Sequence, residues 1–397
     1  MKSKTLNLRA IAEFLVVAVC TATFAFTTLG IGVALMNRDA AGSRDFVEYW
    51  AAGQQIVHRA NPYDDAAIHA LERSAGFPSG VPTLIMANPP SALLLVLPLG
   101  VLGPRAGELF WEILLLASLI ASIQMVRRMH GSPKNLKHLL AFAFAPVLSC
   151  LLSGQVSIFV LLGLVLFLNL HRSHPFAAGA SLWLCMLKPH LFLPFGLVLL
   201  VWIFVSRSYK VLAGTLITLG LSSVIATILN PRVWEQYLNM MGTERVDRGI
   251  IPCMSAMLRL YVPPHSLWLQ CLPSAIGCFW ALVYFRKHRD DWDWIEHGSL
   301  LMLVSVFVAP YTWFMDQAVL IPALLHGAYC THSRTLIAVF ALMSAVIEIE
   351  ILRNVPLLHS ALYAWTTPAW LAWYLIAHRT ERGFTIRELS PETGRAI

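Results

Sequence analysis

The fold of this chain is decided by uninterrupted apolar stretches, the clearest of which reads ILLLASLIASIQMV from Ile113 to Val126. Its residues do not alternate between apolar and polar, as the strands of a membrane β-barrel would. A helix closes all of its backbone hydrogen bonds within one segment, which is what a lipid environment requires. The stretch therefore predicts a membrane-embedded α-helix.

The composition extends this prediction to the whole chain. Of the 397 residues, 57% are hydrophobic and 13% are charged, and that charged fraction is about half of the value typical of soluble domains. Because one crossing takes about 20 apolar residues, we expect an all-α polytopic membrane protein with about 12 transmembrane helices, within a range of about 10 to 13. The chain leaves no room for a separate soluble domain.

The charge balance and the cysteines exclude several classes of function. Lys and Arg total 29 against 22 Asp and Glu, a net charge of +7. There is no dense basic arm of the kind that binds nucleic acid, so the excess is better explained by basic loops on the cytoplasmic side. The seven cysteines form no CxxC pair and the 14 histidines form no HxxxH or HExxH, so neither a disulfide framework nor a metal site is expected.

The longest charged segment lies directly after the first apolar stretch, whose length favours an uncleaved helix over a signal peptide. Inside this segment, residues 46–59 predict a helix lying in the interface, with Tyr49 and Trp50 at headgroup depth. The expected organisation is one integral membrane domain over residues 1–397, with a first transmembrane helix at 11–36, a catalytic outer loop at 37–87, the remaining helices at 88–377 and a cytoplasmic tail at 378–397.

A short segment bounded by prolines leaves the topology open. Asn88-Pro89-Pro90 starts an apolar stretch that ends near Leu102. If this stretch is re-entrant or interfacial, the basic loops all face the cytoplasm, with about 12 crossings and both termini inside. If it spans the bilayer, the orientation of everything downstream changes.

Two charged residues stand out as candidates for chemistry. Asp45 lies just after the first helix, where a carboxylate can accept a proton from a sugar hydroxyl; a solvated loop acid or an N-cap is the alternative. Lys188, followed by Pro189, is flanked by apolar sequence on both sides. An ammonium beside a broken helix suits a phosphate, while a lysine reaching from a helix end to the interface explains it equally well.

Other polar residues inside apolar sequence are weaker candidates. Gln155 follows Gly154 and offers a carboxamide to sugar hydroxyls, although a turn between helices also explains the pair. Asp316 is either a functional acid within the membrane or an acid favoured at a helix N-terminus. Asp291-Trp292-Asp293 spells the DxD of nucleotide-sugar transferases, but it sits in a short basic loop without an α/β domain, so we expect a solvated loop that anchors at the interface. Glu348 and Glu350 have no assigned role.

Several motifs occur together in a recognisable order. They are Asp45…Tyr49 with Asn61-Pro62-Tyr63-Asp64, Asn88-Pro89-Pro90 followed by Pro98-Leu99, Trp111, Gly154-Gln155, Ala178-Gly179…Lys188-Pro189, and Pro310…Asp316…Pro322. This arrangement resembles the polyprenyl-phosphate-sugar-dependent glycosyltransferases of family 87, in the GT-C superfamily, over about residues 40–330. The sequence departs from the family at Arg59-Ala60, where a glycine is usual, and at Val156, where an asparagine is usual.

The resemblance implies a GT-C-like fold and an inverting sugar transfer on the outer face of a bacterial plasma (inner) membrane. It makes Asp45 the general base, with Lys188 and His190 stabilising the departing polyprenyl phosphate and with Gln155, Asp316, Tyr49 and Tyr63 contacting the substrates. Mannose is the first expectation for the sugar, and arabinose or another pentose or hexose stays open. The acceptor is a lipid or glycan, and the scheme requires no nucleotide, cofactor or metal.

Two other classes of protein remain as alternatives. A multi-pass transporter or lipid-linked-sugar flippase also needs intramembrane charges and broken helices, but it typically keeps its charges near the midplane. The long charged first loop, with Asp45 at the membrane edge, favours the transferase. A structural scaffold is disfavoured by the polar residues within apolar sequence.

Overall fold

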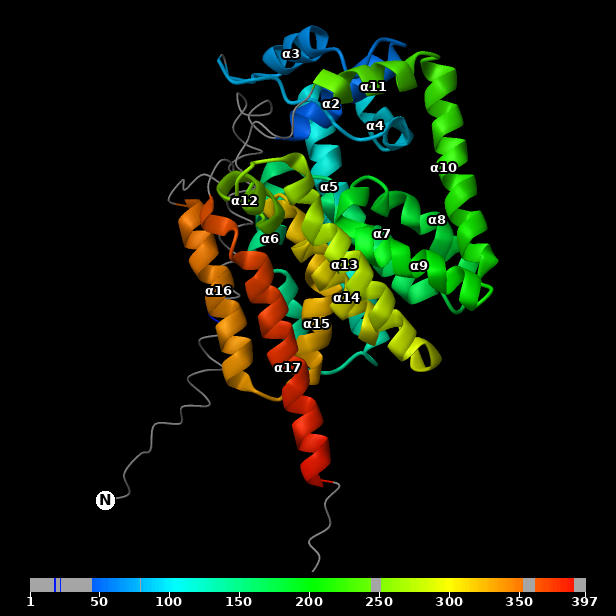
Figure 1. Cartoon of the computed structure of the whole chain (residues 1–397). Helices are drawn as coiled ribbons and strands as arrows, with labels where there is room; N and C mark the ends of the chain where they lie inside the picture. The colour runs from blue at the N-terminus through cyan, green and yellow to red at the C-terminus, as the bar shows by residue number, and fades with distance from the viewer. Residues whose placement is uncertain are drawn as a thin grey trace, which may run out of the picture.

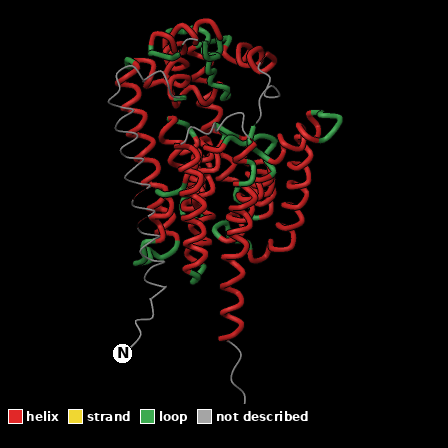
Figure 2. The backbone as a smooth tube through the Cα atoms, turned by 90° about the vertical axis from the view of Figure 1, so that its left-hand side faces the viewer, coloured by secondary structure: helices red, strands yellow, loops and turns green. Residues whose placement is uncertain are grey.

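The computed structural model describes residues 45–78, 80–243, 251–352 and 361–388, together with the isolated positions 18 and 22. Apart from those two positions, the helix expected at 11–36 lies outside the described residues. The described part is α-helical and contains no strand, which confirms the predicted fold class at that level (Figures 1 and 2).

The elements follow one another along the chain as α-helices joined by short 3-10 helices. The α-helices are α2 (Phe46–Val57), α3 (Asp65–Ser74), α4 (Leu93–Val96), α5 (Pro104–Met129), α6 (Ala145–Ser153), α7 (Ser157–Leu170), α8 (Pro175–Cys185), α9 (Leu193–Val205), α10 (Tyr209–Leu229), α11 (Val233–Thr243), α12 (Met254–Tyr261), α13 (Leu267–His288), α14 (Glu296–Phe307), α15 (Ile321–Cys330), α16 (Arg334–Leu352) and α17 (Thr366–Glu388). The 3-10 helices are η2 (Pro90–Ala92), η3 (Leu97–Val101), η4 (Lys137–Ala141), η5 (Pro189–Phe192), η7 (Arg289–Asp291), η8 (Phe314–Leu320) and η9 (Ala361–Tyr363).

Three helices of the described part are long and apolar enough to cross a membrane: α5, α10, and α13 with its extension to Asp291. On α10, the outward side is apolar, and more than half of each of Leu216, Ile217, Leu221, Val224 and Ile228 is exposed. Such a face is unfavourable in water and suits hydrocarbon. The other apolar helices are shorter, so the expected count of about 12 crossings stays a prediction. The last helix, α17, continues to Glu388 and so includes the first residues of the tail expected at 378–397.

The molecule has two distinct ends (Figure 1). Helices α2, α3, α4 and α11 gather at one, which we call the α2 end. At the other, α5 and α13 finish and α10 begins; we call it the basic end, because the basic residues Arg127, Arg128, Arg207, Lys210, Arg286, Lys287 and Arg289 lie there. The described part therefore has an α2 end and, opposite to it, a basic end.

The Pro-bounded segment does not form one continuous helix. It is divided into η2, α4 and η3 and packs closely on α2, where a Cβ added at Gly53 would lie 2.5 Å from the carbonyl oxygen of Val96. Two α2 side chains satisfy the carbonyl at its end, since Trp50 Nε1 and Gln54 Nε2 each donate to Leu102 O at 2.9 Å. A piece of this length is too short to cross a bilayer, which favours the re-entrant or interfacial alternative.

Helix α2 (Phe46–Val57) confirms the helix expected at 46–59, and its aromatic rings pack inside the protein. Tyr49 and Trp50 are only 1% and 4% exposed and pack inside the protein. The Tyr49 ring stacks on Trp111, with 5.4 Å between ring centroids. The two rings therefore contact protein side chains, and their expected position at headgroup depth stays a prediction.

Candidate active site

A buried ion pair forms the centre of the candidate site. Lys188 Nζ donates to Asp316 Oδ1 at 2.6 Å, and the two side chains are 11% and 0% exposed. Removing both charges from water is costly unless their remaining hydrogen-bonding groups are satisfied. They are: the ammonium also donates to Ser157 Oγ at 3.1 Å and to Gln155 Oε1 at 3.2 Å, so its three protons have three acceptors.

The backbone explains how these two residues reach the interior. Lys188 is the residue before η5, which begins at Pro189 in the non-α-helical connection between α8 and α9. Asp316 lies in the first turn of η8, and its Oδ2 accepts the backbone N–H of Trp313 at 3.0 Å. Asp316 therefore does lie at a helix N-terminus, as one of the two alternatives predicted. This position uses only Oδ2, and Oδ1 accepts from Lys188 and Ser157.

Gln155 connects this ion pair to the first loop. Its Oε1 accepts from Lys188 and, at 2.9 Å, from the Tyr49 hydroxyl, while its Nε2 donates to Asp45 Oδ2 at 2.8 Å. Because the oxygen must face the ammonium and the nitrogen must face the carboxylate, the amide has a single sensible orientation. Asp45, Tyr49, Gln155, Ser157, Lys188 and Asp316 therefore form one continuous set of hydrogen bonds, which we call the Asp45 network.

The turn before Gln155 fixes the position of its side chain. Gly154 ends α6 with φ of +77°, and a Cβ there would lie 2.8 Å from Cβ of Phe46. Both the left-handed backbone and the close approach of α2 call for glycine. Trp111 Nε1 donates to Gly154 O at 2.7 Å, so the tryptophan and the Gly-Gln pair belong to one local structure.

The alternative role considered for Asp45 is not seen. It occupies the N-cap position of α2 with helical backbone angles, and its side chain makes no capping hydrogen bond. The carboxylate turns to Gln155 instead and is half-buried. Its orientation is therefore set by the network and not by the helix that follows it.

Glu48 is an acid near the site that the sequence analysis missed. It lies one turn after Asp45 on α2, and burial together with the Asp45 charge raises its pKa from 4.5 to about 8. At neutral pH the Glu48 carboxyl is therefore mostly protonated. The three-residue spacing between Asp45 and Glu48 was the signal in the sequence, because residues three apart lie on the same face of a helix.

His190 and Tyr63 lie next to the Asp45 network without joining it. The His190 ring stacks on Tyr311 at 3.8 Å between centroids, and its Nε2 is buried with no hydrogen-bond partner among the described residues. The Tyr63 hydroxyl donates to Asn88 O at 3.0 Å, and Asn88 Nδ2 donates to Leu187 O at 2.6 Å, directly before Lys188. Tyr63 is thus tied to the Lys188 segment through Asn88.

The DxD-like sequence is used structurally. Asp293 Oδ1 accepts the backbone N–H groups of Ile295 and Glu296, and Oδ2 accepts from Arg172 at 2.7 Å. Trp292 stacks on His297 with ring centroids 5.1 Å apart. The motif therefore stabilises the start of α14 by hydrogen bonds within the loop, as expected for a structural loop and not for a nucleotide-sugar site.

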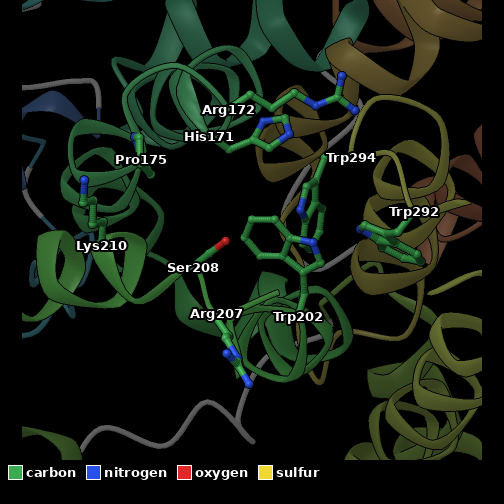
Figure 3. Close-up of a pocket in the computed structure, with 9 residues that line it drawn as sticks. All are labelled: His171, Arg172, Pro175, Trp202, Arg207, Ser208, Lys210, Trp292 and Trp294. Carbon is green, nitrogen blue, oxygen red and sulfur yellow. The ribbon is translucent and has the colours of Figure 1, made fainter. Parts of the chain in front are cut away.

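A cavity of about 470 Å³ is found in the described part (Figure 3), and none of the residues that line it belongs to the Asp45 network. It is lined by His171, Arg172, Pro175, Trp202, Arg207, Ser208, Lys210, Trp292 and Trp294. Since Ser208 and Lys210 stand at the beginning of α10, the cavity belongs to the basic end, opposite to α2 (Figure 1). Its chemistry is separate from that of the carboxylate network.

The candidate site is thus a hydrogen-bonded network inside an apolar helical body, and three of the described helices are apolar and long enough to cross a membrane. The family model for glycosyltransferase family 87 matches residues 87–314, more than half of the chain. The chain belongs to this family and is a glycosyltransferase, as the sequence resemblance indicated. No curated protein and no solved structure gives a significant match.

The matched region is narrower than the resemblance drawn from the motifs. It contains Gln155, Lys188 and His190, whereas Asp45 and Asp316 lie outside it. The roles of these two acids therefore rest on the geometry of the Asp45 network. Family membership also favours the transferase over the transporter or flippase.

Proposed function

We propose that the chain transfers a sugar from a polyprenyl-phosphate donor to an acceptor hydroxyl at the α2 end, with Asp45 as general base. The observation that carries this proposal is the Asp45 carboxylate itself, oriented by Gln155 and backed by the Lys188–Asp316 pair. A base held by hydrogen bonds within reach of the outer loop is suited to an incoming hydroxyl.

The proposed reaction is a single displacement. Asp45 takes the proton of the acceptor hydroxyl as its oxygen attacks the anomeric carbon of the donor sugar. The bond between that carbon and the phosphate oxygen breaks, and the polyprenyl phosphate leaves with the electron pair. Attack opposite to the leaving group inverts the anomeric configuration.

The charges around Asp45 support a phosphate leaving group. Lys188 is the buried cation of the Asp45 network, and its weakest contact is the 3.2 Å bond to Gln155. A donor phosphate that replaces Gln155 at this contact accepts a hydrogen bond from the Lys188 ammonium, while Asp316 keeps its own hydrogen bond to Lys188. The unpartnered Nε2 of His190 provides a second group for the same oxygens.

A lipid-linked donor is supported by the apolar outer faces of the helices, which keep a polyprenyl chain in hydrocarbon. The outer-face orientation is supported by the basic end, because Lys and Arg concentrate in cytoplasmic loops. In this orientation the α2 end faces outward from a bacterial inner membrane. Mannose remains the first expectation for the sugar and a lipid or glycan for the acceptor.

The test uses full-length protein in lipid nanodiscs, polyprenyl-phosphate sugars and a mixed glycan acceptor pool. Asp45→Asn keeps the hydrogen-bonding shape and removes the base, so the turnover should fall by about 10²- to 10⁴-fold. Asp65→Asn, an exposed acid of the same loop, is the matched control and should retain activity. Wild-type turnover by Asp45→Asn would contradict the assignment of the base, and sugar movement across the bilayer without transfer would favour the flippase.

A further inference from the structure

A cluster of histidine and cysteine side chains lies at the basic end, away from the Asp45 network. His326 and Cys330 are one turn apart on α15, and His378 approaches them from α17. The nitrogen and sulfur atoms that these three residues offer all lie within 4.8 Å of one another. The helices are adjacent in Figure 1, with α17 running beside α15.

Hydrogen bonds fix which nitrogen of His326 faces the cluster. His130 Nδ1 lies 2.8 Å from Val126 O, and because a carbonyl only accepts, this nitrogen carries the proton. In the neutral His130 ring, Nε2 is then the acceptor for His326 Nδ1, 3.0 Å away. The proton of His326 is therefore on Nδ1, and its Nε2 presents a lone pair. Such a partner on the far nitrogen is the usual support of a metal-binding histidine.

His378 has the complementary arrangement. Its Nδ1 is buried and finds no hydrogen-bond partner among the described residues. Its Nε2 lies 3.9 Å from a carboxylate oxygen of Glu296. A nearby carboxylate favours the proton on Nε2, which leaves the buried Nδ1 with an unused lone pair. An unsatisfied buried nitrogen needs an explanation, and a metal ion is one.

The spacing of the His326 and Cys330 ligand atoms agrees with that of two ligands of a tetrahedral zinc ion. With Zn–N of about 2.05 Å and Zn–S of about 2.3 Å, two ligands at a tetrahedral angle stand about 3.6 Å apart. His326 Nε2 and Cys330 Sγ are separated by 3.7 Å. The i, i+4 spacing on one helix supplies this pair, and α17 supplies the third ligand.

We propose that His326, Cys330 and His378 bind a zinc ion, with His130 and Glu296 as the groups that orient the two histidines. Two imidazoles and a thiolate suit this borderline-soft cation better than Mg²⁺ or Ca²⁺, which prefer oxygen. The ion connects α15 to the last helix of the chain, so its role is to hold α17 in place. The transfer chemistry at the α2 end does not depend on it.

A second group of ligand-type residues provides an internal comparison. His288, Asp291 and His297 also lie within 4.8 Å by their ligand atoms. Asp291, however, is 72% exposed, and His297 Nδ1 is already 2.8 Å from the Tyr284 hydroxyl. We expect no tight metal binding there, and His288→Gln serves as a matched control.

The experiment uses the full chain in detergent, without a histidine tag, after treatment with a chelator. Titration with Co²⁺ should give tetrahedral visible bands and a thiolate-to-cobalt charge-transfer band, and elemental analysis after Zn²⁺ loading should give one ion per chain. Cys330→Ser should abolish the charge-transfer band, and both Cys330→Ser and His378→Gln should weaken Zn²⁺ binding at least about tenfold. His288→Gln should bind as the wild type does.

Thermal unfolding separates a bound ion from a packed cluster. Zn²⁺ should raise the unfolding temperature of the wild type and of His288→Gln, but not that of Cys330→Ser, since only a ligand that binds the folded state stabilises it. A wild-type chain that takes up no stoichiometric Zn²⁺ would overturn the proposal. So would equal uptake by Cys330→Ser and His378→Gln, which places the ion elsewhere.

Discussion

Replacing Asp316 by asparagine tests the central ion pair without any assumption about the substrate. The Lys188 ammonium would remain in the interior, next to an uncharged amide, with 11% of its side chain exposed. Breaking a buried pair by removing one partner typically costs about 3–5 kcal/mol. We expect Asp316→Asn, and likewise Lys188→Met, to lower the free energy of unfolding by an amount in this range.

The double variant Lys188→Met/Asp316→Asn should recover part of the loss. It leaves no unpaired charge. The asparagine oxygen can take the place of Oδ2 and accept the Trp313 backbone N–H, while its NH2 group takes the place of Oδ1 and can donate to Ser157 Oγ. A double-mutant cycle should therefore give a coupling of about 2–3 kcal/mol between the two sites.

The assay is denaturant unfolding in mild detergent, monitored by intrinsic fluorescence. Arg172→Gln provides the contrast, because it breaks an ion pair of similar length whose arginine is 71% exposed. That change should cost no more than about 1 kcal/mol. If the losses of the two single variants simply add in the double variant, the pair is not coupled and the reasoning is refuted.

Three further predictions concern the surroundings of the network. Gly154→Ala should destabilise the fold by about 1–3 kcal/mol, since its backbone is left-handed and its Cβ would meet Phe46, whereas Gly196→Ala in open space should be neutral or stabilising; thermal unfolding of both variants checks this. Trp111→Phe loses the donor to Gly154 O, so unfolding measurements should show a loss of about 1–3 kcal/mol from the stranded carbonyl and the smaller ring. The Glu48 carboxyl has a pKa of about 8 in the folded state and about 4.5 in the unfolded state. As the pH rises from 4.5 to 8, the unfolded state releases this proton while the folded state keeps it. The free energy of unfolding therefore falls, by at most about 1.4 kcal/mol per pH unit. Glu48→Gln should remove this part of the slope, and parallel curves for the two proteins would show that Glu48 does not titrate as stated.

The sequence predicted the helical body and the family because both depend on local patterns. Apolar runs marked the helices, and short motifs such as Gly154-Gln155 and Lys188-Pro189 kept their order along the chain. The same patterns could not show which residues meet in space. Lys188 and Asp316 are 128 positions apart, and Asp45 and Gln155 are 110 apart.

The residues that were missed share a physical reason. Ser157 looks like an ordinary small residue at the start of α7, yet its hydroxyl is shared between Lys188 and Asp316. The pair His326 and Cys330 does not match a motif of two histidines, because one member is a cysteine. The third residue of the cluster, His378, comes from another helix. In each case the missing information was the identity of a distant neighbour.

The Asp45 network has a consequence for the birth of the protein in the membrane. Its first member emerges near the start of translation, and its last, Asp316, appears only after roughly four fifths of the chain has been made. Until then Lys188 lacks the Asp316 carboxylate, and Gln155 and Asp45 are not yet held by the complete network. The candidate site is therefore complete only when most of the chain has been made, so a partly synthesised chain lacks the assembled network.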